Sequence, residues 1–302
     1  MNSQTRRWFR RVLLAIGCVF ILALGWAAAE RVRGPSMEPI PASFPHIVRN
    51  PPPGPVPDWR SSSPPKPDPA VDSLHRRGIT GRGAGIAVID SFLFADHREF
   101  QRHLCWYDEI DGAAQDPAGW HGTAVASIAA GGSVGVAPEA DLYFVGLGLL
   151  WAGPQMPWGN WFVAADRAAH IGQPLPIAIH RILEMNRRLA PDRRIRAISI
   201  SIGLTRWTQA GAKAAFEEAR RAGVFVSAVD LGLEPYGPVT VASPTAPDAY
   251  ATYPAAGSWA MAYWAGRYIL ASQDDPNMTP GAFLEQIRRD ASLGKTRPTV
   301  PR

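Results

Sequence analysis

Three residues whose side chains could together carry out nucleophilic catalysis occur in the order Asp90, His121, Ser258. A serine hydroxyl is a weak nucleophile at neutral pH, so it needs a base within hydrogen-bond reach, and that base needs an orienting carboxylate. Asp90 ends the apolar run GIAVID, His121 opens the run HGTAVAS, and Ser258 lies near the start of GSWAMA. Acid, base, nucleophile is one of three chain orders that build this kind of site. The three residues therefore indicate a hydrolase.

The chain around these residues alternates between predicted strands and helices. Apolar, β-branched runs predict strands at 85–89, 140–146, 195–202 and 224–229. Helical periodicity and capping residues predict helices at 121–130, 177–189, 209–222, 258–271 and 279–291. This alternation predicts an α/β fold in three layers, with a mostly parallel central sheet and helices on both faces. Asp90 then ends a strand at the sheet edge where such folds place their binding crevice, and amides at the start of the Ser258 helix could stabilise an oxyanion.

These sequence contexts resemble those of the subtilisin-like serine proteases, or subtilases, over roughly residues 80–292. The run GVAPEA at 135–140 is similar to the one that follows the family's histidine helix, and 276–288 resembles its closing helix. The resemblance implies a subtilisin-like fold and a serine endopeptidase acting on peptide or protein substrates. It assigns the roles of acid to Asp90, base to His121 and nucleophile to Ser258. It also implies that three residues of SISIG line the substrate groove and pair with an extended peptide: Ser201, Ile202 and Gly203.

Departures from the family pattern concern the rate of the reaction. The proline and histidine of the family's GTSMATPH are missing, and Trp259 and Tyr263 are bulky. The family's oxyanion asparagine falls on Asp230 or Leu231, and an ionised aspartate cannot donate a hydrogen bond to an oxyanion. Losing such a donor costs about 10²- to 10³-fold in rate, so we expect a slow enzyme. The alternative is a catalytically impaired subtilase fold that binds peptides or acts as a scaffold. A lipase or esterase is disfavoured because the chain has no GxSxG elbow.

The N-terminal quarter of the chain predicts membrane attachment or export. Residues 1–11 form a basic cytoplasmic region, and 12–29 are 18 residues without a charge, just long enough to span a bilayer. We expect a membrane-anchored protein with an extracytoplasmic catalytic domain, or a secreted or periplasmic one if 1–29 is a cleaved signal peptide. Residues 30–75 read as a linker, because 13 of the 29 prolines lie within 34–70. The catalytic domain is expected at 76–292 and a tail at 293–302.

Charge and cysteine usage exclude other classes of function. Much of the net charge of +5 lies in the N-terminal arginines, and no nucleic-acid-binding motif is present, so no nucleic-acid partner is expected. The two cysteines, Cys18 and Cys105, indicate neither a disulfide framework nor a zinc site, and no cofactor is expected. Calcium sites are common in subtilases. The best acidic candidates are DEID at 108–111 and DDPN at 274–277, although solvated turns also explain both.

Overall fold

The computed structural model describes seven stretches of the chain: 69–110, 120–147, 174–201, 209–228, 239–243, 247–253 and 257–292. The chain divides into two units, Met1–Ala42 and Ser43–Arg302, and every described residue belongs to the second. The predicted membrane segment at 12–29, most of the proline-rich linker and the tail lie outside the described residues. Among the helices that are described, none has the length and apolar character needed to cross a membrane.

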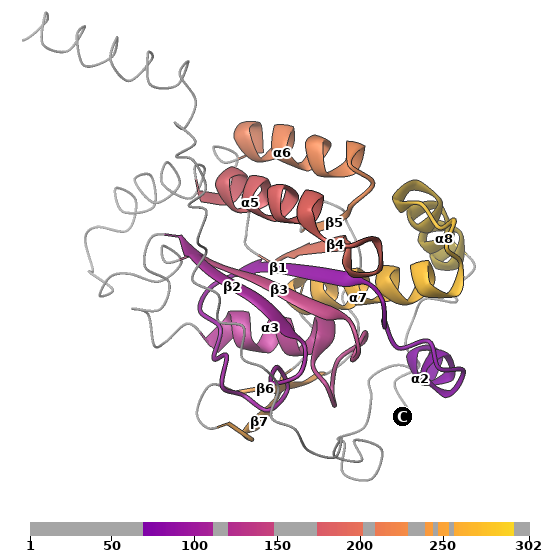
Figure 1. The fold of residues 1–302 in the computed structure, drawn as a ribbon. Coiled ribbons are helices and arrows are strands. Elements are labelled where there is room, and N and C mark those ends of the chain that lie inside the picture. The colour runs from indigo at the N-terminus through magenta and orange to yellow at the C-terminus, as the bar shows by residue number, and fades with distance from the viewer. Residues whose placement is uncertain are drawn as a thin grey trace, which may run out of the picture. The chain divides into compact units, whose positions relative to one another are not determined.

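A parallel five-stranded sheet forms the centre of the fold (Figure 1). Its strands lie in the order β2-β3-β1-β4-β5, which confirms the predicted mostly parallel sheet. Their bounds are β1 Gly85–Asp90, β2 Leu104–Ile110, β3 Asp141–Leu147, β4 Ile195–Ile200 and β5 Phe225–Ala228. A separate antiparallel pair consists of β6 Val239–Ala242 and β7 Tyr250–Tyr253. The sequence predicted β1, β3, β4 and β5, but not β2, β6 or β7.

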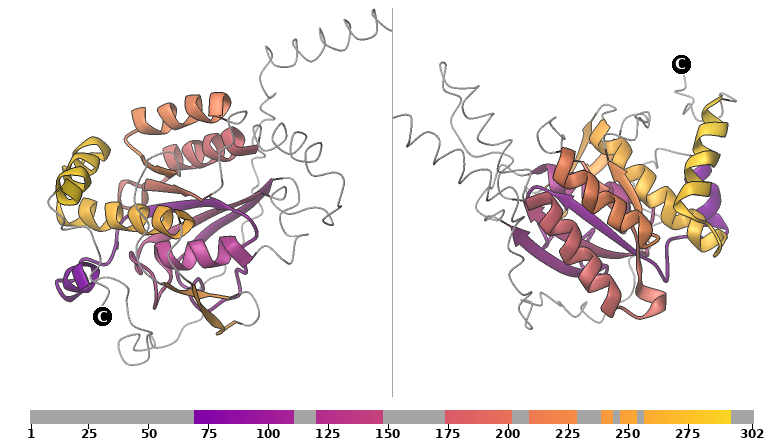
Figure 2. Two further views of the ribbon diagram at one scale, coloured as in Figure 1. Left: turned by 180° about the vertical axis from the view of Figure 1, so that it is seen from behind. Right: turned by 90° about the horizontal axis from the view of Figure 1, so that it is seen from above.

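Helices cover both faces of this sheet, as predicted (Figures 1 and 2). On one face lie α5 Pro174–Arg188 and α6 Gln209–Arg221, and on the other lie α3 Trp120–Ala130 and α7 Gly257–Asp274. Strand β1 contributes to both cores: Ile86 and Val88 pack with α3 and α7, whereas Ala87 and Ile89 pack with α5 and α6. This alternation is the two-residue period of a strand buried on both sides. The remaining helices are α2 Pro69–Arg76, the 3-10 helix Pro191–Arg193 and α8 Pro280–Ser292.

Helix α2 lies within the range predicted as linker, so the boundary expected at residue 76 falls too late in the chain. Val71 is buried in the core, and His75 Nε2 donates a hydrogen bond to the Val136 carbonyl oxygen at 2.8 Å. Pro69 begins the helix, where a proline costs no backbone hydrogen bond. The packed domain therefore includes α2, because a proline-rich segment can still end in a short helix that has an apolar face.

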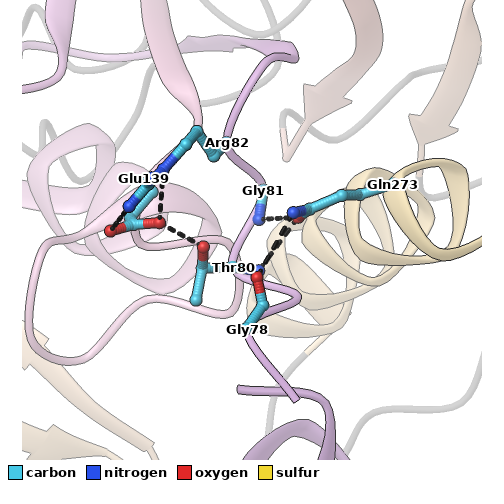
Figure 3. Close-up of polar contacts among 6 residues, drawn as sticks. All are labelled: Gly78, Thr80, Gly81, Arg82, Glu139 and Gln273. Atoms are coloured by element: carbon cyan, nitrogen blue, oxygen red, sulfur yellow. Dashed lines mark hydrogen bonds and ion pairs between the residues drawn. The ribbon is translucent and has the colours of Figure 1, made fainter. Parts of the chain in front are cut away.

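A group of polar contacts, here called the clamp, joins the segment before β1 to the end of α7 (Figure 3). Gln273 Oε1 accepts hydrogen bonds from the backbone N–H groups of Thr80 at 2.9 Å and Gly81 at 2.6 Å. Glu139, just before β3, accepts hydrogen bonds from the Thr80 hydroxyl and from the Arg82 guanidinium. Gly81 has φ +92°, and a Cβ there would lie 2.9 Å from the Ala137 Cβ. The clamp thus fixes the amino-terminal edge of the sheet to α7.

Candidate active site

Asp90 is the last residue of β1, at the carboxyl-terminal edge of the sheet. Its side chain is completely buried. The oxygen Oδ1 accepts hydrogen bonds from the Ser91 backbone N–H at 2.7 Å, from the Ser91 hydroxyl at 3.2 Å and from His121 Nδ1 at 2.8 Å. Such donors compensate a buried carboxylate for the water that it has lost. Asp90 is therefore held in one orientation by groups that all meet at a single oxygen.

His121 lies in the first turn of α3, which approaches the end of β1 very closely. A Cβ on Gly122 would lie 2.6 Å from the Phe92 carbonyl oxygen and 2.8 Å from that of Ser91, so only glycine permits this approach. The Gly122 N–H donates to the Ser91 hydroxyl at 3.0 Å. The HGT motif thus has a local reason: glycine lets the histidine reach the aspartate.

Two opposing effects set the protonation of His121. Burial lowers the pKa of the imidazole, but the hydrogen bond to Asp90 and its negative charge outweigh burial, so the pKa lies above the ordinary 6.5. With Nδ1–H donating to Asp90, the neutral ring carries its lone pair on Nε2. The arrangement is that of an oriented general base.

Ser258 lies in the first turn of α7, beside the residue that follows β4. The Ser258 hydroxyl donates to the Ser201 carbonyl oxygen at 3.4 Å, and the Ser201 hydroxyl donates to the Ser258 carbonyl oxygen at 3.0 Å. Strand β4 runs beside β1 with Ile200 opposite Ile89, so Ser201 comes to the same edge as Asp90. Within the described residues, the hydrogen bond of the Ser258 hydroxyl thus goes to Ser201 and not to His121.

Trp259 connects the start of α7 to the histidine. Its ring stacks on the His121 imidazole, with 5.2 Å between the ring centroids and 27° between the planes. The structure therefore brings Asp90 and His121 into direct contact. The contacts of Ser258 are with Ser201, while its chain neighbour Trp259 stacks on His121. The sequence indicated Asp90, His121 and Ser258 as candidate catalytic residues, and Ser201 as a candidate groove residue. It did not predict the stacking, whose only signal was a bulky residue after the serine.

Other predicted site residues lie outside the described part of the chain. They are the two alternatives for the oxyanion position and two of the three groove residues: Asp230, Leu231, Ile202 and Gly203. Their predicted roles are proposals below.

The acidic segments named as the best calcium candidates have other partners where they are described. Asp108 is on β2 rather than in a turn, and Arg181 of α5 pairs with it at 2.7 Å. Glu109 accepts a hydrogen bond from the Tyr107 hydroxyl at 2.6 Å, and Asp274 pairs with Arg77 at 2.7 Å. Among the described residues, no group of three or more His, Cys, Asp or Glu side chains could hold a metal ion.

Comparison with known proteins identifies one family. The model of the subtilase family, Peptidase S8, matches residues 81–251, which is more than half of the chain. This match includes Asp90, His121 and Ser201 and ends before Ser258. The subtilisin-like protease PopC of Myxococcus xanthus (strain DK1622) is 35% identical over 119 residues. That alignment covers 34% of this chain and 25% of PopC, so the chain spans about a quarter of the length of this relative.

Solved structures with a similar arrangement include two proteases. A cold-adapted subtilisin-like serine proteinase has 16% sequence identity and a TM-score of 0.46, covering 68% of this chain and 81% of its own. The prenylagaramide maturation protease PagA has 15% identity and a TM-score of 0.49, covering 73% of this chain and 86% of its own.

Proposed function

Because the chain belongs to the subtilase family, we propose that it is a serine endopeptidase in which Asp90, His121 and Ser258 act as acid, base and nucleophile. The observation that carries this proposal is the hydrogen bond between buried Asp90 and His121 at the edge of the sheet where α7 begins. Many buried ion pairs are structural. This one orients a partly exposed imidazole that stacks on Trp259, the residue after Ser258, which supports a role for His121 as the base of a nucleophilic serine.

The reaction follows from these positions. His121 Nε2 takes the proton of the Ser258 hydroxyl as Oγ attacks the substrate carbonyl carbon, and Asp90 stabilises the imidazolium that forms. The imidazolium then protonates the leaving amine, the peptide C–N bond breaks, and an acyl-enzyme remains on Ser258. Water, deprotonated by the same histidine, releases the acyl group as a carboxylic acid. The Ser258 hydroxyl must first leave the Ser201 carbonyl oxygen to reach Nε2, and catalytic hydrogen bonds commonly tighten only when substrate binds.

Substrate binding and oxyanion stabilisation come from the same edge of the sheet. Ser201, Ile202 and Gly203 pair with an extended peptide, which positions the scissile bond through main-chain hydrogen bonds. The backbone N–H of Ser258, at the start of α7, supplies one donor to the oxyanion. Asp230, or its neighbour Leu231, occupies the place of the second donor, and turnover is slow for that reason. Residues 12–29 anchor the protein, with the catalytic domain outside the cytoplasm, and carbonate extraction of membranes tests this placement.

A fluorophosphonate probe tests the proposal, because it reports an activated serine without knowledge of the substrate. The full chain should be labelled, and Ser258→Ala should abolish labelling. Ser272→Ala is a matched control: Ser272 lies on the same helix, is buried, and donates only locally to the Ile269 carbonyl oxygen at 2.9 Å. Equal labelling of the parent and Ser258→Ala would disprove the assignment of the nucleophile.

The second candidate function is a subtilase fold that binds peptides without cleaving them. The reciprocal bonds between Ser201 and Ser258 favour it, because they give the hydroxyl a partner other than the base. A folded parent protein that binds extended peptides but is not labelled would support this candidate and contradict the peptidase.

A further inference from the structure

Trp259 contacts the proposed base directly, although it is not one of the three residues assigned to the reaction. It follows Ser258 in the chain, where the family motif has methionine, and it is buried, with 4% of its surface exposed. Its neighbours on α7 are also aromatic, but Trp264 packs against Tyr263 and Phe283 rather than against His121. Only one of these two tryptophans thus reaches the site.

The contacts on His121 constrain the ring in two different ways. The hydrogen bond from Nδ1 to Asp90 fixes one edge of the imidazole. A single bond of this kind still allows the ring to turn about the line that joins the two atoms, and that turn moves Nε2. A flat contact with the indole, at 27° between the planes, opposes this turn because it defines the plane of the ring.

We infer that Trp259 is a positioning residue that fixes the plane of the His121 imidazole and so aims Nε2 at the Ser258 hydroxyl. The inference rests on the proposed function. The indole face also favours the imidazolium that forms in each catalytic cycle, because the negative face of an aromatic ring attracts a cation. Among the described residues, Asp90 on β1 is the charged group that acts on His121. The indole adds to the effect of that carboxylate.

Histidine NMR tests the stack without any need for activity. The full chain, labelled with ¹³C at the histidine ring carbons and with His121 assigned by His121→Gln, should show His121 ring-proton signals shifted upfield of a free histidine, because the imidazole stacks on the indole. In Trp259→Met these signals should move downfield, and the His121 pKa should fall by about half to one unit. Trp259→Phe should give a smaller change of the same sign.

Trp264→Phe is the matched control, since it removes a buried indole from the same helix and should leave the His121 signals and pKa unchanged. His121 ring protons at the free-histidine positions in the parent protein would overturn the inference, and so would an unchanged His121 pKa in folded Trp259→Met. If Trp259→Met does not fold, the parent spectrum alone still tests whether the His121 ring stacks on the indole.

Labelling rates separate this inference from the proposed function. The fluorophosphonate rate of Trp259→Met should fall by about 10- to 100-fold relative to the parent. The acid limb of its pH profile should move to lower pH, which a merely structural role would not cause. If the parent shows the NMR signature but no labelling, the peptidase proposal fails while the stack stands. If the parent is labelled and Trp259→Met retains its rate and pH profile, the peptidase stands and the inference fails.

Discussion

The amino-terminal and carboxyl-terminal edges of the central sheet, where its strands begin and end, differ in how their polar groups are paired. At the amino-terminal edge, the clamp pairs backbone donors with the side chain of Gln273, and hydrogen bonds from Arg82 and Thr80 lower the pKa of Glu139 despite its partial burial. At the carboxyl-terminal edge, Asp90 Oδ2 is buried and has no hydrogen-bond partner in the described part of the chain. Ser258 there bonds to a carbonyl rather than to the base. The first edge holds fixed partners, which suits stability. The second holds a carboxylate oxygen without a described partner and a serine hydroxyl on a single carbonyl, both of which are able to take a new partner.

The largest expected effect is at the carboxyl-terminal edge. Asp90→Asn should lower kcat/KM by roughly 10³- to 10⁴-fold, because the imidazolium loses its counter-charge. The melting temperature should fall as well. The amide oxygen can replace Oδ1, where all three donors meet, but the new NH₂ takes the place of the buried Oδ2, which has no described partner, at a cost of about 1–3 kcal/mol for a buried unpaired donor. Peptidase kinetics and a circular dichroism melt measure both. A loss of activity below about 10-fold would mean that the base does not depend on this carboxylate.

A substitution at Asp230, the candidate oxyanion residue, should increase activity. If Asp230 occupies the oxyanion position, Asp230→Asn should raise kcat by roughly 10²-fold with little change in KM, because the restored bond forms only in the transition state. Steady-state kinetics on a peptide substrate measures this. Asp230→Leu is the control, since it removes the charge without supplying a donor. An unchanged or lower kcat in Asp230→Asn would place another residue at the oxyanion.

The amino-terminal edge should respond in stability alone. Gln273→Ala leaves the backbone N–H groups of Thr80 and Gly81 without their acceptor, at a cost of about 1–3 kcal/mol for a buried unpaired donor. Chemical denaturation should detect this, while labelling by the probe at low temperature stays at the parent rate. Arg82→Gln is the control: its side chain is 76% exposed, so the stability should change less. Slower labelling of folded Gln273→Ala would show that the two edges are not independent.

The smallest expected effect is the pH dependence of stability. The pKa of His121 is raised in the folded protein, so its contribution to stability is fully present below pH 6.5 and is lost as the pH rises through the folded pKa. Activity has the opposite dependence, because only the neutral ring accepts a proton. Denaturation from pH 5 to 9 should show this loss in the parent, and Asp90→Asn should reduce it. An equal loss in Asp90→Asn would assign the effect to another group.

The sequence predicted the parts of this fold that depend on local pattern. Continuous apolar runs identified β1, β3, β4 and β5. The helix predicted at 279–291 is observed as α8, and the hydroxyl of Thr279, just before it, accepts a hydrogen bond from the Ala282 N–H at 3.2 Å. Strand β2 was missed because its residues Asp108 and Glu109 suggest a turn. They are accommodated there because Arg181, 73 residues later, neutralises Asp108.

The candidate site was predictable to the same extent. Motifs singled out Asp90, His121 and Ser258 as candidates because glycine and small residues leave a local signature around them, and the contact between Asp90 and His121 is observed. The pairing of Ser201 with Ser258 and the stacking of Trp259 on His121 depend on how α7 lies against β4 and α3. No local pattern encodes such packing between segments that are distant in the chain.

Helix α7 joins the two edges, because its 18 residues carry Ser258 at one end and Gln273 at the other. At 1.5 Å per residue it is about 27 Å long. A peptidase is always surrounded by copies of itself, and a copy becomes a substrate when its chain opens. If Ser258 is the nucleophile, an opening that releases the whole of α7 from the sheet displaces it, so such an opened molecule could not cut itself. Autodigestion would then require one intact molecule and one opened molecule, and its rate would rise with the square of the protein concentration.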